Sequence, residues 1–280
     1  MVPVDHASRR ESQALAGARC VGAAFLTVLA CAGAAAAGPA APAGINDQRC
    51  RLGAARQPFL PVLPAARNTL RETGRLTIVA LGSSTTAGSG REAGDSYPAI
   101  LEAELSRRLP NAVVTVVNKG VGGQSAYDML LRMQEDVTDL KPSIVIWQAA
   151  VNDVIRDIGE QKLAKILRKG ISQVQAAGID MVLMDLPWLP REGRYPQYDD
   201  YRAVLGKTAR ELKVPVFPRY AVMQSWATSK QFTAGELVGM DGLHLVDAGY
   251  RCLSVRIADG IAASLTGAKP DMAETPRATN

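Results

Sequence analysis

One short stretch carries a dense group of hydroxyl side chains that could supply a nucleophile. Residues 78–90 read IVALGSSTTAGSG, so an apolar run ends at Gly82 and small hydroxyl residues follow it. A serine hydroxyl is a weak nucleophile until a neighbouring base takes its proton. The stretch is therefore either an ordinary polar loop or the position of a nucleophilic serine. The second interpretation requires a base elsewhere in the chain.

The only histidine beyond the N-terminal segment is His244, since the other is His6. Asp241 stands three residues before His244 in MDGLHLVDAGY, and Gly242 permits a tight turn between them. A carboxylate at this spacing can hydrogen-bond one ring nitrogen and direct the other toward a hydroxyl. A lone histidine is more often a structural residue, so His244 gains weight only in combination with other motifs. The presence of a single histidine beyond the N-terminal segment also excludes a metal site built from several histidines.

Short apolar runs alternate with helical patterns from Arg75 onward. The runs show no polar alternation, so the strands are expected to be buried on both faces, as in a parallel sheet. The order predicts one α/β domain, a three-layer α/β/α sandwich around a mainly five-stranded parallel sheet. The expected strands are 76–81, 112–117, 143–147, 179–184 and 214–217. The expected helices are 96–109, 125–140, 160–176, 198–212 and 246–265.

Small residues or an amide follow each of the first three expected strands. Gly82-Ser83-Ser84 follows the first, NKGVGGQS at 118–125 follows the second, and QAAVND at 148–153 follows the third. Ligands of an open parallel sheet bind beyond the carboxyl ends of its strands. We therefore expect these three connections to meet at one edge, where Trp147 or Gln148 could also approach a pocket.

Four residues appear in a characteristic order on these elements: Ser84, Gly123, Asn152 and His244. In this order they resemble the signature residues of the SGNH hydrolases, the GDSL-type esterase and lipase superfamily. The resemblance covers about residues 75–265. It is nearer still to exported bacterial SGNH proteins that carry GSSTTAG in the first block and DGLH…GY in the last. It implies a flavodoxin-like SGNH hydrolase fold.

The resemblance also implies a role for each matched residue. Ser84 would attack an ester carbonyl, His244 would take and return its proton, and Asp241 would orient His244. The oxyanion would be bound by the backbone N–H groups of Ser84 and Gly123 and by the side-chain amide of Asn152. Such an enzyme forms an acyl-serine intermediate and needs neither a metal nor another cofactor.

Two departures from the superfamily pattern stand next to these residues. Ser83 occupies the place of the usual aspartate in Gly-Asp-Ser, and Ala150-Val151 replaces a glycine and its variable neighbour. Neither change removes a reacting atom. Ser83, Thr85 and Thr86 are interpreted as structural residues that can cap the following turn.

Three glycines follow the second strand, so the backbone donor there has three candidates. They are Gly120, Gly122 and Gly123. Gly123 lies five residues after Asn118, which is the superfamily spacing, and is preferred for that reason.

Aromatic and basic side chains near the later motifs allow two interpretations each. The aromatic group is Trp188, Tyr195, Tyr198 and Tyr201, and the basic group is Arg156, Arg191 and Arg194. Packing of loop and helix is preferred for the aromatic group, with a wall for an acyl chain or a sugar as the alternative. Solvated surface is preferred for the arginines, with contact to an anionic substrate as the alternative.

The N-terminal segment has the pattern of an export signal. Arginines precede an uncharged run rich in alanine and glycine at 20–37, which ends in small residues suited to cleavage. A membrane anchor is the alternative, although the Ala/Gly content makes the run a weak one. The chain is thus divided into a signal at 1–37, a Pro/Ala-rich arm at 38–70, the hydrolase domain at 71–266 and a flexible tail at 267–280. The expected location is periplasmic or secreted.

The predicted export bears on the redox state of the cysteines. Cys20 and Cys31 lie in the predicted signal, so Cys50 and Cys252 remain in the mature chain. A pair of cysteines in an oxidising compartment predicts a disulfide, with two unrelated buried thiols as the alternative. The bond would tie the N-terminal arm to the last expected helix.

Composition limits the partners and leaves three hypotheses for function. The chain of 280 residues is 47% hydrophobic and 21% charged with a net charge of +5, and shows no basic stripe that would indicate nucleic acid. The first hypothesis is a serine esterase for short acyl groups, such as O-acetyl on a glycan. The second is an O-acyltransferase with the same residues. The third is a non-catalytic glycan- or envelope-binding protein. We expect a small-molecule or glycan ester as substrate and no stable membrane insertion after cleavage, and the oligomeric state is left open.

Overall fold

Five parallel strands form the central sheet, in the order β2-β1-β3-β4-β5. The computed structural model describes residues 47–52, 58–191 and 193–267. The strands are β1 (Arg75–Gly82), β2 (Val113–Gly120), β3 (Ile144–Trp147), β4 (Asp180–Met184) and β5 (Val216–Phe217). The sheet confirms the predicted α/β fold class and the chain order of its strands. The predicted signal 1–37 and the tail from residue 268 lie outside the described residues.

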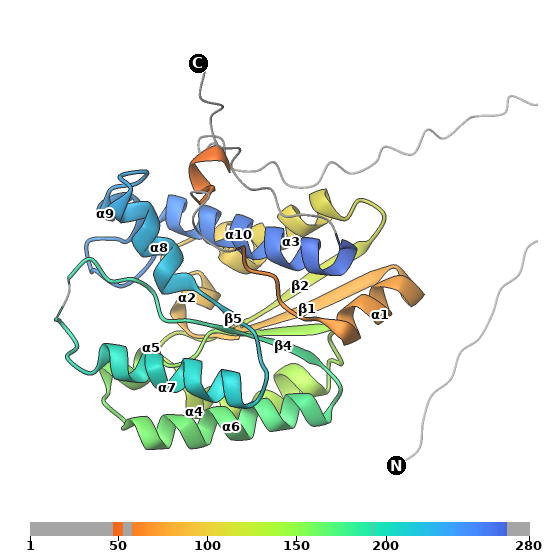
Figure 1. The fold of residues 1–280 in the computed structure, drawn as a ribbon, viewed down its shortest axis with the longest axis horizontal. Helices are drawn as coiled ribbons and strands as arrows, with labels where there is room; N and C mark the ends of the chain where they lie inside the picture. The colour runs from red at the N-terminus through yellow and green to blue at the C-terminus, as the bar shows by residue number, and fades with distance from the viewer. Residues whose placement is uncertain (1–46, 53–57, 192, 268–280) are drawn as a thin grey trace, which may run out of the picture. The chain divides into compact units, whose positions relative to one another are not determined.

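Helices cover both faces of this sheet, as Figure 1 shows. One face carries α1 (Pro64–Thr73), α3 (Tyr97–Arg108), α8 (Arg219–Thr228), α9 (Ala234–Leu237) and α10 (Asp247–Thr266). The other face carries α4 (Ala126–Leu131), α5 (Val151–Ile155), α6 (Glu160–Ala176) and α7 (Tyr198–Glu211). Shorter turns are η1 (Asp47–Cys50), α2 (Ser84–Ala87), η2 (Ala93–Asp95) and the π-helical η3 (Gln134–Thr138).

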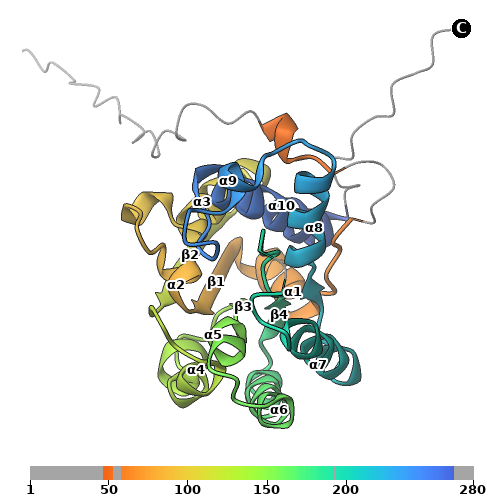
Figure 2. The same ribbon diagram turned by 90° about the vertical axis from the view of Figure 1, so that its left-hand side faces the viewer.

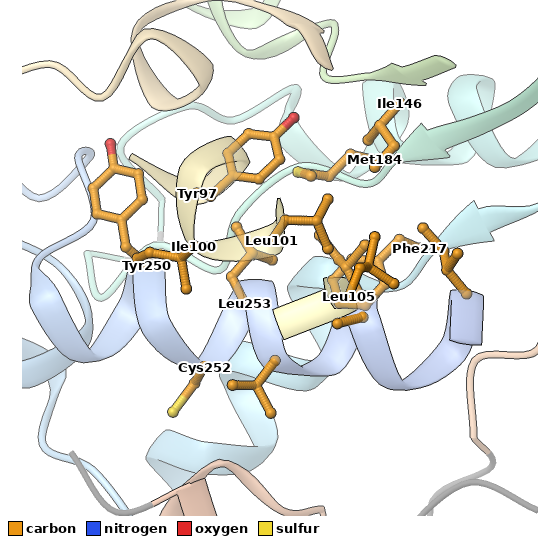
Figure 3. Packing of buried hydrophobic residues seen from close by; sticks show 14 of the residues in the cluster. Tyr97, Ile100, Leu101, Leu105, Ile146, Met184, Phe217, Tyr250, Cys252 and Leu253 are labelled. Atoms are coloured by element: carbon orange, nitrogen blue, oxygen red, sulfur yellow. The ribbon is translucent and has the colours of Figure 1, made fainter. Parts of the chain in front are cut away.

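Alternate residues of the central strands β1, β3 and β4 enter two separate hydrophobic cores. In β1, Ile78 and Ala80 face α3 and α10, whereas Val79 and Leu81 face the helices of the opposite layer. All four are fully buried. Figure 3 shows the first core, where side chains of α3 and α10 meet those of β3 and β4. Burial on both faces explains why β1, β3 and β4 read as unbroken apolar runs. The prediction was wrong for β2, which lies at the edge of the sheet and is exposed at Val113 and Thr115.

The predicted disulfide between Cys50 and Cys252 is present, with an S–S distance of 1.99 Å. It joins η1 to α10, and both sulfurs are buried in the first core. Arg49 adds a hydrogen bond to the Gln231 carbonyl at 2.7 Å. The segment at 47–52 is therefore held against the domain at two neighbouring points.

Several element predictions were incomplete. Helix α1 lies largely inside the predicted arm at 38–70, although Pro64 at its first position is a typical helix start. The predicted helix 125–140 is interrupted, because α4 ends at Leu131 and a π-helical turn follows. Helix α8 was not predicted; it directly follows the two-residue strand β5, and no side chain caps it.

None of the helices in the described ranges is long and apolar enough to span a bilayer.

Candidate active site

The carboxyl ends of β1, β2 and β3 meet at one edge of the sheet, which faces the viewer in Figure 2. Ser84 opens α2 directly after β1, and Asn152 lies in α5 after β3. Two hydrogen bonds join the connections: Val121 N–H donates to the Gly82 carbonyl at 3.0 Å, and Asn152 Nδ2 donates to the Gln124 carbonyl at 2.8 Å. The loop after β2 is thereby held between the other two.

A continuous chain of hydrogen bonds links Ser84, His244 and Asp241. His244 Nε2 lies 2.9 Å from Ser84 Oγ, and His244 Nδ1 lies 2.5 Å from Asp241 Oδ2. A carboxylate beside Nδ1 selects the tautomer with its proton on Nδ1, which leaves the Nε2 lone pair to accept from the serine hydroxyl. The His244 side chain is 33% exposed, so a ligand can reach the pair from solvent.

The second oxygen of Asp241 is also occupied. Oδ1 accepts from the backbone N–H groups of Leu243 at 2.9 Å and His244 at 3.0 Å. Burial acts to raise the pKa of Asp241, but the hydrogen bonds from the His244 side chain and these two N–H groups outweigh it and lower the pKa to about 2. The carboxylate therefore stays ionised and fixed in orientation beside the imidazole.

A tight turn presents His244 at this edge. An isolated antiparallel bridge pairs Val238 with Leu245, and Gly239 N–H donates to the His244 carbonyl at 2.8 Å. Gly242 has a φ of +71°, a left-handed conformation that glycine adopts without steric cost. The turn explains why a three-residue spacing brings the Asp241 carboxylate to the ring of His244.

Gly123 and Asn152 lie in two segments that contact each other, next to the hydrogen-bonded residues Ser84, His244 and Asp241. Gly123 has a φ of +77°, and its carbonyl accepts from Arg156 Nη2 at 2.7 Å. Asn152 Nδ2 carries two hydrogens, and the bond to the Gln124 carbonyl uses one of them. Their role as donors to a bound oxyanion stays a prediction. Arg156 is exposed, as predicted, but it also holds this loop.

The three candidate glycines after β2 differ in their surroundings. A Cβ at Gly120 would lie 2.1 Å from the backbone nitrogen of Ala87, so α2 packs directly on this strand end. Nothing lies within 4 Å of a Cβ at Gly123, where the conformation alone favours glycine. The choice of Gly123 as the donor stays a prediction.

The model of the non-GDSL lipase-like family matches residues 49–266, most of the chain. This chain belongs to that family. The membership confirms the superfamily predicted from Ser84, Gly123, Asn152 and His244.

Two of three curated relatives of this family member carry enzyme names. The thioesterase 1/protease 1/lysophospholipase L1 of Escherichia coli K12 is 28% identical over 160 residues, which cover 57% of this chain and 74% of that one. The arylesterase of Vibrio mimicus is 25% identical over 168 residues, covering 60% of this chain and 78% of that one. An uncharacterised lipoprotein of Bacillus subtilis is 23% identical over 214 residues, covering 65% and 88%.

Solved structures agree with the family at the level of the fold. An acetylxylan esterase from Geobacillus stearothermophilus has a TM-score of 0.57 at 22% identity, covering 66% of this chain and 94% of that one. A G-D-S-L family protein from Desulfitobacterium hafniense has a TM-score of 0.54 at 22% identity, covering 65% and 97%.

The structure shows what the replacement of a superfamily glycine means in this family member. Ala150 has a φ of +77°, the left-handed conformation in which a Cβ crowds the backbone at a cost of about 1–2 kcal/mol. Ala150 N-caps α5, the helix that carries Asn152. Alanine therefore adopts the conformation that a glycine would favour, directly before the helix that carries Asn152.

Contrary to the prediction, Ser83 and Thr86 do not cap α2. Ser83 stands at the N-cap position, but its side chain makes no capping hydrogen bond. The hydroxyl groups of Ser83 and Thr86 instead lie 3.2 and 3.1 Å from Gln148 Oε1. The loop that carries Ser84 is thus tied to the end of β3.

Asp153, the neighbour of Asn152, holds the start of α4. Its two carboxylate oxygens accept from the backbone N–H of Ala126 at 2.9 and 3.1 Å. Burial raises the pKa of Asp153, since its side chain is fully enclosed, and the hydrogen bond from Ala126 opposes this rise. The residue supports the loop after β2 from behind.

The segment between β4 and α7, here called the wall, contacts the helix that carries Asn152 and the turn that carries Asp241. Gln197 Nε2 donates to the Val154 carbonyl in α5 at 2.9 Å, and Arg194 Nη1 donates to the Asp241 carbonyl at 2.9 Å. A cavity of about 380 Å³ lies on this wall. Its lining includes Tyr195, Tyr198, Tyr220, Arg194 and Asp199. Tyr201, by contrast, is fully buried and serves packing, as predicted.

One positioning residue was missed from the sequence. Arg132 donates to the carbonyls of Gly82 and Lys119 at 3.1 and 2.9 Å and to Gln124 Oε1 at 2.7 Å. It thus joins the ends of β1 and β2 to the loop that contains Gly123. An arginine inside a helical pattern carries no local signal for this role.

In the described residues, no group of three or more His, Cys, Asp or Glu side chains is arranged to hold a metal ion.

Proposed function

We propose that this protein is a serine esterase that hydrolyses carboxylic esters through an acyl-serine intermediate. The observation that carries the proposal is the 2.9 Å contact between Ser84 Oγ and His244 Nε2, combined with the 2.5 Å contact between His244 Nδ1 and Asp241. A serine, a base and a group that orients the base are the parts that an activated hydroxyl needs. Relatives named esterase, arylesterase and thioesterase support the same reaction class.

In the first half of the reaction, Ser84 Oγ attacks the ester carbonyl carbon while its proton passes to His244 Nε2. The tetrahedral intermediate collapses, the bond to the leaving oxygen breaks, and Nε2 gives that oxygen the proton. In the second half, water attacks the acyl carbon, Nε2 takes its proton, and Ser84 leaves with that proton restored. Asp241 stabilises the imidazolium that forms in each half.

The negative charge on the carbonyl oxygen needs donors, and three are available. The Ser84 N–H lies at the first position of α2, where no acceptor within the helix exists. The Gly123 N–H and the second hydrogen of Asn152 Nδ2 complete the proposed oxyanion hole. Loss of one such donor costs about 3–4 kcal/mol in a serine hydrolase.

We propose short acyl groups, such as O-acetyl on a glycan, as the substrate class. The wall cavity of about 380 Å³ adjoins the Asp241 turn through Arg194. Its tyrosine rings can pack against the C–H groups of a sugar leaving group, because the face of an aromatic ring is electronegative. Arg194 and Asp199 offer a donor and an acceptor for hydroxyl groups. The reaction as proposed uses neither a metal nor another cofactor.

We also propose that the protein is exported, with residues 1–37 as the signal and 38–70 leading into the hydrolase domain. The disulfide between Cys50 and Cys252 supports this location, because such bonds persist in oxidising compartments. The N-terminal sequence of the mature protein, determined after expression with its leader, tests the proposed boundary.

Covalent labelling with a fluorophosphonate tests the proposed mechanism. We expect one label on Ser84, located by mass spectrometry, and hydrolysis of p-nitrophenyl acetate that is lost in Ser84→Ala. Transfer of the acyl group to an added sugar hydroxyl in preference to water would identify an acyltransferase. Absence of label, with residual hydrolysis unchanged in Ser84→Ala, would contradict the esterase and favour a glycan-binding protein.

A further inference from the structure

A buried amide lies directly beneath the nucleophile turn. Gln148 Oε1 lies 2.9 Å from the backbone nitrogen of Ser83, 3.2 Å from Ser83 Oγ and 3.1 Å from Thr86 Oγ1. The Gln148 side chain is enclosed, since only 1% of the residue is exposed. Three donors around one atom identify that atom as the oxygen of the amide.

The backbone fixes where this amide stands. Gln148 N–H donates to the Leu81 carbonyl at 2.8 Å, which continues the pairing of β1 with β3 by one residue. A Cβ added at Gly82 would lie 2.0 Å from Thr86 Oγ1 and 2.8 Å from Gln148 Oε1. Glycine at position 82 is therefore what allows the amide and the turn to approach each other.

Helix α2 needs such an anchor because it is short. It has four residues, and an isolated helix of this length is unstable in water. Its entry N–H at Ser83 is buried, and a buried N–H that loses its partner is costly. Gln148 gives this N–H an acceptor and binds Thr86 on the far side of Ser84, so it holds the turn on both sides of the nucleophile.

We propose that Gln148 is a positioning residue that keeps Ser84 Oγ within hydrogen-bonding distance of His244. The proposal rests on the proposed function, and it gives a physical role to Ser83, the residue that stands in place of the usual aspartate. The connection that begins with Gln148 leads into α5, which carries Asn152, so one segment supports both the nucleophile turn and a proposed oxyanion donor.

Gln148→Met tests the proposal, since methionine has a similar length and offers no comparable acceptor. The matched control is Gln175→Met, which removes one hydrogen bond, to the Leu212 carbonyl, on the exposed surface of α6. Three readouts apply to the purified protein at a temperature where all variants remain folded. They are hydrogen–deuterium exchange of a peptide that contains residues 83–87, the rate at which fluorophosphonate labels Ser84, and the kcat and KM for p-nitrophenyl acetate.

We expect Gln148→Met to exchange faster at residues 83–87 and to label about 100-fold more slowly, the scale of an ångström-level misplacement of a reacting group. The KM for p-nitrophenyl acetate should stay within about twofold while kcat falls, because the ester and its pocket are untouched. The Gln175→Met control should match the wild type in all three measurements.

The exchange measurement separates this proposal from the esterase proposal. If the wild type takes no label, the esterase fails, and unchanged exchange in Gln148→Met would still show that the amide anchors nothing. Normal labelling and exchange in Gln148→Met would overturn the positioning role alone. If Gln148→Met does not fold, Ser83→Ala combined with Thr86→Val removes two donors from the opposite side. That pair should also give faster exchange and slower labelling, and wild-type values would overturn the proposal.

Discussion

Asparagine in place of Asp241 should hold His244 in the wrong tautomer. Oδ1 of Asp241 accepts from the N–H groups of Leu243 and His244, so the side-chain oxygen of Asp241→Asn must occupy that position. The amide nitrogen then faces His244 Nδ1, where a carboxylate oxygen now lies at 2.5 Å. Because an NH₂ group can only donate there, Nδ1 must accept and the ring proton moves to Nε2, facing Ser84.

The expected loss is large because Nε2 then has no lone pair for the Ser84 proton. In serine proteases the corresponding change lowers kcat by about 10⁴-fold. At about 1.36 kcal/mol for each tenfold change, this corresponds to about 5.5 kcal/mol of transition-state stabilisation. Asp241→Ala removes the unwanted donor, so Nδ1 can donate to water and a fraction of His244 keeps the productive tautomer. We therefore expect the alanine variant to be the more active of the two.

The assay is the initial rate of p-nitrophenyl acetate hydrolysis near neutral pH for the wild type, Asp241→Asn and Asp241→Ala. Thermal unfolding of each variant shows that the comparison concerns folded protein. An asparagine variant that exceeds the alanine variant, or that retains about a tenth of wild-type kcat, would refute the argument from the two N–H groups on Oδ1.

Two further predictions concern stability. Burial acts to raise the pKa of Glu104, but hydrogen bonds from Arg108 and Arg107 lower it from 4.5 to about 2. The carboxylate thus contributes about 3 kcal/mol above pH 4.5, lost as the pH falls toward 2. Urea unfolding of Glu104→Gln should show this loss at neutral pH and less than half of it at about pH 3; a pH-independent loss would contradict it. The disulfide spans 202 positions, so the double alanine variant of Cys50 and Cys252 should lose about 5 kcal/mol, and reduced wild type should shift similarly. An unchanged unfolding midpoint in both would count against this.

Local sequence patterns were sufficient to predict most of the fold. The apolar runs at β1, β3 and β4 are strands because residues buried on both faces of a parallel sheet have no reason to alternate with polar ones. The turns that interrupt 125–140 could not be read in the same way. A π-helical turn and a short α4 depend on packing against the sheet, which periodicity does not report.

The sequence by itself determined the residue types and the side of the sheet at which they gather. Small residues after successive parallel strands must lie at one edge, and Asp241 must lie close to His244 because a single turn separates them. Two cysteines outside the predicted signal were sufficient to predict their bond. The first two inferences use only neighbours in the chain or a general rule of sheet topology, and the third uses the number of cysteines that remain outside the predicted signal.

Only the tertiary structure decided the hydrogen-bond geometry between distant segments. His244 meets Ser84 from 160 positions away, and Gln148 reaches Ser83 from 65 positions away. Neither distance leaves a trace in local composition, since an amide beneath a turn and an amide in a loop look alike in sequence. Hydrogen-bond geometry depends on where folded backbones place side chains to within a fraction of an ångström. That precision arises only when the whole sheet is assembled.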